Sequence, residues 1–487
     1  MIGQCGLTPT PNLSILRPRT AIKRRAESQN NNNKWTPSMP ILTRDAAMAV
    51  SVSFARKKVF TNNARGKNYS LALGLLGISV LPDAAQAQGF MDDSHGTLTL
   101  RNYYMDRDYK DNGARTAIRE WAQGFIMNAE SGFTEGPVGL GLDARALVGM
   151  KLDSSPDRSG TELLPVSAGD GRAADEYSRL ALTGKLKFRE TTLKTGDVSI
   201  FLPFAFASPS RLLPQTFRGT TLTSKEIDGL TLNAGYIDRV NKRDSTNYQA
   251  ISIASPNRRF NAAATSSHMT YAGGDYQVSK ALSVRVYHAE VADLYTQNTL
   301  ALLHKLDVGD GVMTTDLRSF FSRDTGSAKA GEVDNQNLSA LLGYKWGGHS
   351  VSLGYMHASG ATATPYVSGT ELMGLSEMTM SSDFLNARER TWQAIYDYDF
   401  TAVGVVGLRS RLRYIRGDNI ELSAFNADDR KEREFQMELG YVVQSGPLKN
   451  VGLLARKSIY RNDFPTGAAF RDENQTRFIV QYSVPIW

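Results

Sequence analysis

The sequence has almost no cysteine and no long apolar run, and each absence excludes a class of protein. Its one cysteine, Cys5, lies in an N-terminal segment that we do not expect in the mature chain. Disulfides, zinc–thiolate sites and thiol nucleophiles are therefore excluded from the remainder. A membrane-spanning helix needs about 18 or more consecutive apolar residues, and the sequence contains no such run. A bundle of membrane helices is therefore excluded as well.

Motifs for catalysis and for nucleotide binding are also missing. The histidines, at positions 95, 268, 288, 304, 349 and 357, form no Ser/His/Asp or metal-ligand spacing. The Gly-Leu-Gly-Leu run at 139–142 lies inside an alternating segment and fits wall packing better than a phosphate loop. We therefore predict no catalytic residues, no metal site and no cofactor.

A charge excess of one sign is absent from most of the chain, although the formal net charge is +7. The first 87 residues hold twelve Lys or Arg and three Asp or Glu, whereas the rest holds 44 basic and 46 acidic residues. The basic character therefore belongs to the N-terminus. Since no basic-aromatic motif follows it, we predict no nucleic-acid partner.

The N-terminal 87 residues have the pattern of a secretory leader with an added front end. Residues 56–67 are basic, residues 70–81 form a short apolar core, and Ala85-Gln86-Ala87 is an A-x-A cleavage site before Gln88. We assign 48–87 to a signal peptide and 1–47 to a mis-called or atypical extension. An organelle transit peptide is the alternative for the extension. The mature domain is then 88–487.

Alternating apolar and polar residues recur along this mature domain. In Val138–Leu152, even-numbered Val, Leu, Ala and Met residues alternate with Gly, Asp, Arg and Lys. A helix would repeat every 3.6 residues, so the period of two predicts a strand with one apolar face. The segment 404–416 places Arg409, Arg411 and Arg413 on one face and apolar residues on the other. For that segment alone, a half-buried strand with a solvated basic face is equally compatible.

The connections between these strands alternate in length. Short turns are expected at 190–192, 226–229, 277–280, 308–311, 346–349 and 445–448, and long loops at 153–175, 203–217, 241–266, 360–389 and 417–430. Short periplasmic turns and long extracellular loops are typical of outer-membrane barrels. We predict an all-β, transmembrane antiparallel β-barrel of about 18 strands, in the bacterial outer membrane after signal-peptide removal.

Several stretches resemble the OprD family of substrate-selective outer-membrane porins. They include LTLRNYYMDRDY at 98–109, RLLPQTFRG at 211–219, LTSKEIDGLTL at 222–232 and YVVQSGPLK at 441–449. The resemblance implies a barrel of eighteen strands whose third loop, here 203–217, folds into the pore. It also implies a ladder of basic residues that guides carboxylate-bearing solutes, with Arg211 at the constriction. The extension at 1–47 departs from the family pattern.

Lumen-facing cations are the candidate site, because arginine stays charged and presents a fork that matches a carboxylate. The candidates for pore and substrate binding are Arg101, Arg145, Lys185, Arg211, Arg285, Arg409, Arg411, Arg413 and Arg456. Any one of them could instead pair with a lumen carboxylate such as Asp143, Asp397, Glu434 or Glu438. We expect this less of the trio 409, 411 and 413, because three close guanidiniums are hard to neutralise together.

The predicted function is passive diffusion of small carboxylate solutes, either amino acids or aromatic and aliphatic acids, through a narrow pore. An outer-membrane barrel enzyme (a protease or lipase) and a soluble all-β binding protein are the alternatives. The expected partners are the solutes, outer-membrane lipid and lipopolysaccharide, and the barrel-assembly machinery. The expected oligomeric state is a monomer or a weak trimer.

Overall fold

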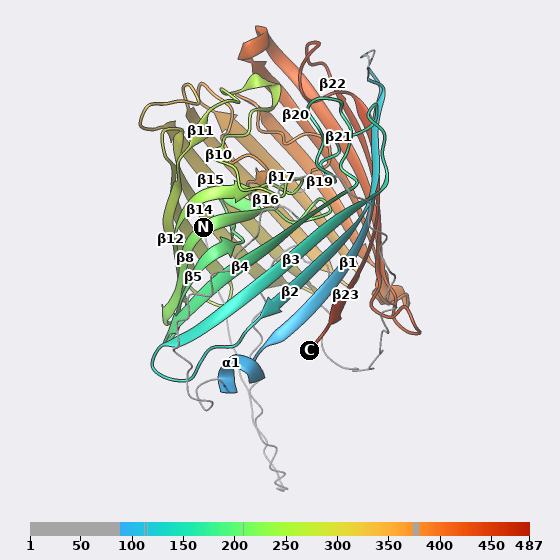
Figure 1. The fold of residues 1–487 in the computed structure, drawn as a ribbon. Coiled ribbons are helices and arrows are strands. Elements are labelled where there is room, and N and C mark those ends of the chain that lie inside the picture. Colours follow the sequence, from blue (N-terminus) through green and yellow to red (C-terminus); the bar gives the residue numbers. More distant parts are fainter. Residues whose placement is uncertain (1–87, 112, 114, 208, 374–378) are drawn as a thin grey trace, which may run out of the picture. The chain divides into compact units, whose positions relative to one another are not determined.

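The computed structural model describes residues 88–487 except 112, 114, 208 and 374–378. Eighteen antiparallel strands form one sheet, and β1 pairs with the last strand, β23, so the sheet closes into a barrel (Figure 1). The wall strands are β1 (His95–Tyr109), β2 (Ala117–Glu130), β3 (Gly139–Asp153), β4 (Glu176–Phe188), β5 (Thr191–Val198), β8 (Thr216–Ile227), β9 (Leu230–Asn241), β12 (Met269–Gln277), β13 (Leu282–Val291), β14 (Tyr295–Val308), β15 (Gly311–Asp324), β16 (Asp334–Trp346), β17 (His349–Ser359), β19 (Arg390–Asp399), β20 (Leu408–Leu422), β21 (Ala427–Val442), β22 (Gly452–Asn462) and β23 (Glu473–Pro485). The predicted fold class and strand number are confirmed.

The period of two in the sequence decides which side chains face out. Leu180 on β4 is 71% exposed and Leu353 on β17 is 60% exposed, although both are large and apolar. Residues of the opposite parity, such as Leu147 and Tyr103, are buried inside the barrel. An apolar outer surface on every side needs a lipid environment, because a soluble protein would cover it. Among the described residues, no helix is long and apolar enough to cross a membrane.

The turns at one end of the barrel are short, as predicted. Residues 189–190, 228–229, 309–310 and 347–348 each connect two strands directly. At the other end, long connections span 154–175, 199–215, 242–268 and 360–389. The predicted long loop at 417–430 is wrong, because β20 continues to Leu422 and β21 begins at Ala427. A two-step change of register after Gly417 keeps this polar stretch in the wall, where its composition resembled a loop.

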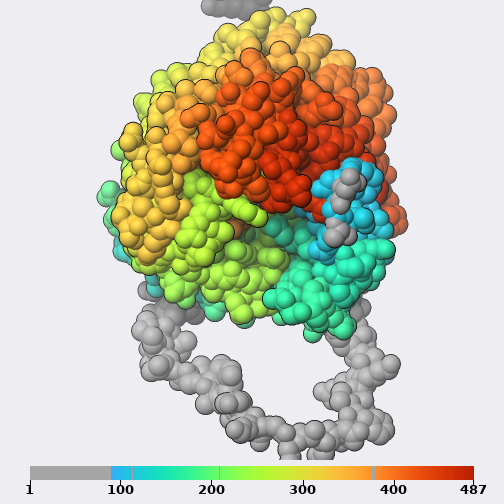
Figure 2. Space-filling view, turned by 90° about the horizontal axis from the view of Figure 1, so that it is seen from above, coloured from blue at the N-terminus to red at the C-terminus, as the bar shows by residue number. Residues whose placement is uncertain are grey.

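Three of the long loops fold inward and pack on the barrel wall. The third loop, defined here as 199–215, carries β6 (Phe201–Leu202) and β7 (Ala205–Ala207), and β7 pairs with β18 (Thr370–Glu371) of the 360–389 loop. The 242–268 loop carries β10 (Ile251–Ser252), β11 (Thr265–Ser266) and the 3-10 helix η1 (Pro256–Arg258). Their apolar side chains form a buried cluster with the inner wall. Viewed from the loop end, the 242–268 loop (yellow-green) lies across part of the opening (Figure 2).

The remaining helices are short and lie at strand ends: α1 (Gln88–Asp92), η2 (Phe400–Val403) and η3 (Ser423–Phe425). The chain end closes against the first strand. Ile486 donates its backbone N–H to the carbonyl of Gly96 over 2.7 Å, and a side chain at Gly96 would meet the ring of Trp487. The ring of Trp487 therefore lies over Gly96. The predicted signal peptide and extension lie outside the described residues.

Candidate functional site

The most buried cation of the lumen is Arg477, near the loop end of β23. Its side chain is 1% exposed, and its Nη2 donates to the carbonyl of Met380 in the 360–389 loop over 3.0 Å. Its Nε donates to the side-chain oxygen of Gln475. Nη1 has no hydrogen-bond partner. Because the residue and its Nη1 atom are both buried, a solute cannot touch them in this arrangement, and the guanidinium acts on anions in the lumen through its uncompensated charge.

Tyr103 on β1 brings this cation together with two of the predicted ones. Arg477, Arg211 and Arg456 all interact electrostatically with its hydroxyl, which donates to the carbonyl of Ser210 in the third loop over 2.9 Å. Arg456 faces Arg477 directly in the register of β22 and β23. Cations from two strands and one loop therefore gather on one side of the lumen.

The third loop is held against this wall by Arg101. Its Nη1 donates to the carbonyls of Arg211 and Leu212 over 2.9 and 3.3 Å, and its Nε donates to Gln481 over 2.9 Å. Gly124 on β2 permits the close approach, because a Cβ there would lie 3.1 Å from the side chain of Leu212. Arg101 therefore holds the third loop in place, in addition to carrying a charge.

Arg211 projects from the third loop beside a second loop arginine, Arg243. Both pair with Glu162, over 3.3 and 3.0 Å, and Arg211 Nε also donates to the carbonyl of Thr161 over 2.9 Å. Burial, followed by repulsion from Arg243, lowers the pKa of Arg211 to about 9. The guanidinium stays protonated at neutral pH, and two cations share one carboxylate. This part of the third loop therefore keeps an excess of positive charge.

The arginine trio of β20 is neutralised more fully than the sequence led us to expect. Arg409 pairs with Asp399 over 3.2 Å and Arg411 with Asp397 over 2.6 Å, whereas Arg413 donates to Gln393 over 2.8 Å. Carboxylates therefore neutralise two of the three, and the third is bonded to an amide. The reason is register, since β19 places Asp399 and Asp397 directly opposite the first two arginines.

The other predicted cations lie elsewhere on the lumen wall, and each has a carboxylate nearby. Lys185 lies 2.5 Å from Asp143 and donates to the carbonyl of Ser131, close to the short-turn end. The remaining ion pairs are Arg145 with Asp197 at 3.6 Å, Arg285 with Asp275 at 3.3 Å, and Arg456 with Glu438 at 2.8 Å. Arg285 stands on β13, away from the cluster around Tyr103.

The acidic residues of β21 anchor the 360–389 loop. Glu434, which we had considered as a partner for an arginine, accepts the backbone N–H groups of Met380 and Ser381 over 3.1 and 3.3 Å. Glu432 accepts the amide of Asn386 over 2.9 Å. Both carboxylates are buried. The loop is therefore fixed inside the lumen by hydrogen bonds to two buried carboxyl groups.

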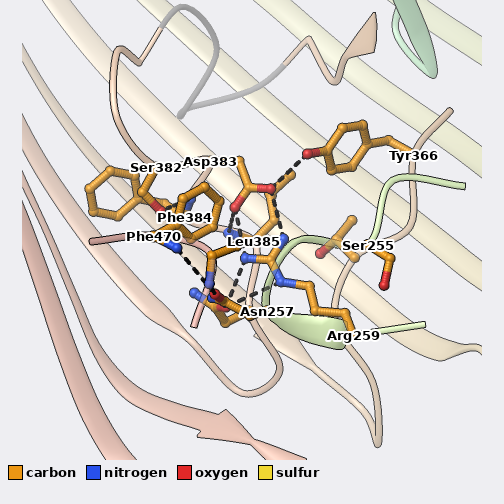
Figure 3. Close-up of polar contacts among 12 residues, drawn as sticks. Ser255, Asn257, Arg259, Tyr366, Ser382, Asp383, Phe384, Leu385 and Phe470 are labelled. Atoms are coloured by element: carbon orange, nitrogen blue, oxygen red, sulfur yellow. Dashed lines mark hydrogen bonds and ion pairs between the residues drawn. The ribbon is translucent and has the colours of Figure 1, made fainter. Parts of the chain in front are cut away.

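A second anchor joins the loops to one another (Figure 3). Arg259 of the 242–268 loop forms a two-pronged ion pair with Asp383, with both N–O distances at 2.7 Å, and Asp383 also accepts the hydroxyl of Tyr366 over 2.8 Å. Arg259 Nη2 donates to the side chain of Asn386 over 2.7 Å as well. The 242–268 and 360–389 loops are therefore joined to each other by this ion pair and its hydrogen bonds.

Sequence reasoning missed Arg477, Tyr103, Arg243 and Arg259. Arg477 and Tyr103 both carry the lumen parity of their strands, so the alternation contained a signal for them. Arg243 and Arg259 lie in a loop, where no periodicity tells which residues point inward. Their positions depend on tertiary contacts alone.

A closed barrel of eighteen strands, with an apolar exterior, a charged lumen and inward-folded loops, is the architecture of a porin. The chain belongs to the OprD family of outer membrane porins, whose family model matches residues 88–486. Proteins of this family are integral to the outer membrane, and so is this chain. The matching relatives are porins, which indicates a channel rather than an enzyme.

Three relatives illustrate the similarity. The porin-like protein GalP of Pseudomonas putida is 37% identical over 407 residues, which cover 83% of this chain and 95% of GalP. The crystal structure of OccAB3 of Acinetobacter baumannii is 42% identical, with a TM-score of 0.79, and covers 81% of this chain and 100% of that one. OpdK of Pseudomonas aeruginosa, solved with vanillate, is 38% identical, with a TM-score of 0.76, and covers 82% and 100%.

Proposed function

We propose that this porin admits small carboxylate-bearing solutes by passive diffusion along a ladder of lumen cations. The observation that carries the proposal is Arg477, a buried guanidinium that has no carboxylate partner among the described residues and leaves Nη1 without a hydrogen bond. Arg101, beside it on β1, is bound to an amide and to backbone carbonyls rather than to an acid. A carboxylate solute in the lumen is attracted by the positive charge that these arginines leave uncompensated.

Several modest sites in series suit conduction better than one deep site, because the solute has to leave as well as enter. Arg211 and Arg243 supply one such site at the third loop. Arg456 and Arg477 supply a second site on β22 and β23. Arg411 supplies a third on β20, on the other side of Glu438 from Arg456. OpdK, a relative, was solved with vanillate, which is an aromatic carboxylate. This supports a preference for acids of that kind, while amino acids remain the alternative class.

We infer that the protein is a channel rather than an enzyme, since its matching relatives are porins. A monomeric or weakly trimeric state, and insertion by the barrel-assembly machinery, remain predictions. The specific solute is part of the same proposal and requires the transport measurement below.

The proposal is tested with liposomes that contain the purified protein, by comparing the swelling rates in benzoate and in benzamide. The two solutes have nearly the same size and differ in charge. Benzoate is expected to enter faster, and Arg477→Gln is expected to slow benzoate about tenfold while leaving benzamide unchanged, because the attraction of one lumen cation is lost.

The matched control is Arg285→Gln, which removes a lumen arginine that already pairs with Asp275. Its benzoate rate is expected to fall less than that of Arg477→Gln, because the carboxylate of Asp275 already offsets part of the field of this arginine. Equal rates for benzoate and benzamide in the parent protein would refute the proposal. Equal losses in the two variants would show that total lumen charge, rather than the Arg477 site, controls entry.

A further inference from the structure

Three arginines form a row on the outer face of the barrel, where lipid is expected. Arg416 on β20 lies directly opposite Arg433 on β21, and Arg433 lies directly opposite Arg461 on β22. All three share the parity of outward residues such as Leu412 and Leu439, which are exposed. Like charges directly opposite on neighbouring strands repel one another, so this row needs an external counter-charge.

The described part of the protein offers the row no carboxylate. Neither Arg416 nor Arg433 takes part in an ion pair there, and Arg461 donates to the carbonyls of Tyr460 and Glu473 and to the side chain of Asn474. The acid nearest along β20, Asp418, pairs with Arg390 at 2.9 Å. Two guanidinium groups are therefore available to a ligand outside the barrel.

The row stands at the loop-side edge of the apolar surface. One step toward the short turns, Tyr414, Phe435 and Ile459 occupy the same three strands in register. Tyr414 and Ile459 are exposed on the outer face. Aromatic residues mark the boundary between hydrocarbon and headgroups in such barrels. The arginines therefore lie at the depth of the headgroups of the outer leaflet.

A groove of about 640 Å³ opens on the outer surface beside the row. Leu342, Leu353, Trp392, Ala394 and Tyr414 line it, and Arg416 lies at its rim together with Asp418, which pairs with Arg390. Trp392 packs on Tyr355 with ring centroids 4.3 Å apart, which builds one wall of the groove. An apolar groove that ends at a cation fits an acyl chain attached to a negatively charged headgroup.

We propose that this outer face binds lipopolysaccharide, with a headgroup phosphate on Arg416 and Arg433 and an acyl chain in the adjoining groove. Arginine forks hold phosphate in two-pronged geometry, and clusters of basic residues at a membrane boundary bind anionic headgroups. The occupant is a phosphorylated lipid rather than a protein, because the row borders an apolar face that the bilayer covers.

The test is native mass spectrometry of the purified barrel in detergent with added rough-type lipopolysaccharide, either intact or dephosphorylated by a phosphatase. The parent protein is expected to bind the phosphorylated form about tenfold more tightly, in line with the loss of a charge-assisted contact. This comparison needs no variant. Equal binding of the two forms would overturn the proposal, and so would equally tight binding of phosphatidylglycerol.

The variant arm compares two double substitutions with the same change in charge. Arg416→Gln with Arg433→Gln is expected to abolish the preference for the phosphorylated form. Arg119→Gln with Arg218→Gln, which removes arginines near the loop ends of β2 and β8 that already pair with Asp106 and Asp238, is expected to keep it. Heat-modifiable migration on a gel confirms that both variants are folded. Equal loss of the preference in both would refute the assigned site.

Discussion

Arg477 lies directly opposite Arg456 in the pairing of β22 with β23, so two guanidinium groups face each other on the lumen wall. Continuing along the same row, Arg456 opposes Glu438, Glu438 opposes Arg411, and Arg411 opposes Asp397. Charges alternate in sign along this row until they reach Arg456 and Arg477, where the alternation breaks. That break leaves excess positive charge where the third loop meets the wall, and it is the physical basis of the proposed selectivity.

The β20 part of the proposed ladder is tested by removing positive charge in one variant and negative charge in another. Arg411→Ala combined with Arg413→Ala is expected to slow benzoate flux about threefold to tenfold with the barrel intact, because cations are lost from the path. Asp397→Asn removes the negative partner that lies 2.6 Å from Arg411 and is expected to raise benzoate flux. Single-channel currents measure both. Changes of the same sign in the two variants would contradict the ladder.

The position of the third loop is expected to depend on the small residue at 124. A valine at Gly124 would press on Leu212, whose side chain would lie 3.1 Å from the new Cβ, so the loop has to move into the lumen. We expect a lower single-channel conductance and little loss of barrel stability, because the wall hydrogen bonds remain. Gly440→Val is the control, since a Cβ there meets nothing closer than 3.7 Å. Unchanged conductance in Gly124→Val would show that the loop does not set the pore width.

The ion pair between Arg259 and Asp383 is expected to hold the 242–268 and 360–389 loops closed. Breaking a buried pair by removing one partner costs about 3 to 5 kcal/mol. Arg259→Gln should therefore increase the frequency of current fluctuations in single-channel records. Arg258→Gln is the neighbouring control, because Arg258 only stacks on Phe425, with its guanidinium 5.0 Å from the ring centre. A frequency of current fluctuations in Arg259→Gln equal to that of the parent would contradict the role of this ion pair in holding the loops closed.

Docking of the 360–389 loop is expected to weaken as the pH rises. Burial raises the pKa of Glu389 to about 7, and Asp383 adds to this, while Asn386 and Arg259 oppose it. The docked loop therefore binds more protons than the free loop between about pH 4.5 and pH 7, and its docking loses free energy across that range. Glu432 of β21 faces the same Asn386 side chain.

The measurement for this dependence is the rate of current fluctuations across the same pH range. The parent channel should become noisier as the pH rises toward 7, whereas Glu389→Gln, which carries no titrating proton, should give a flatter profile. A parent channel that becomes quieter with rising pH would refute the sign of the effect.

The wall of the barrel could be predicted from the sequence because period-two patterning is local. The alternation at 138–152 gives the outward and inward faces of β3, and the short turns follow directly from strand ends. The polar stretch at 417–430 misled the prediction because composition alone does not separate a loop from a wall strand that extends beyond the membrane.

The site was predictable only in part, for a related reason. Parity correctly placed Arg101, Arg411 and Arg456 in the lumen, but the partner of each depends on cross-strand register, which no single segment encodes. Asp397 and Glu438 became partners of Arg411 and Arg456, whereas Glu434 holds the loop instead. Contacts from loops, such as those of Arg243 and Arg259, follow from tertiary packing and have no sequence period.

The most direct test of the central claim is the reversal potential of the purified channel in a planar bilayer that separates two concentrations of sodium benzoate. The account predicts the sign of potential that arises when benzoate permeates faster than sodium, because the lumen presents guanidinium groups along one wall. Arg477→Gln should move it toward zero. The opposite sign, which arises when sodium permeates faster than benzoate, would contradict the account.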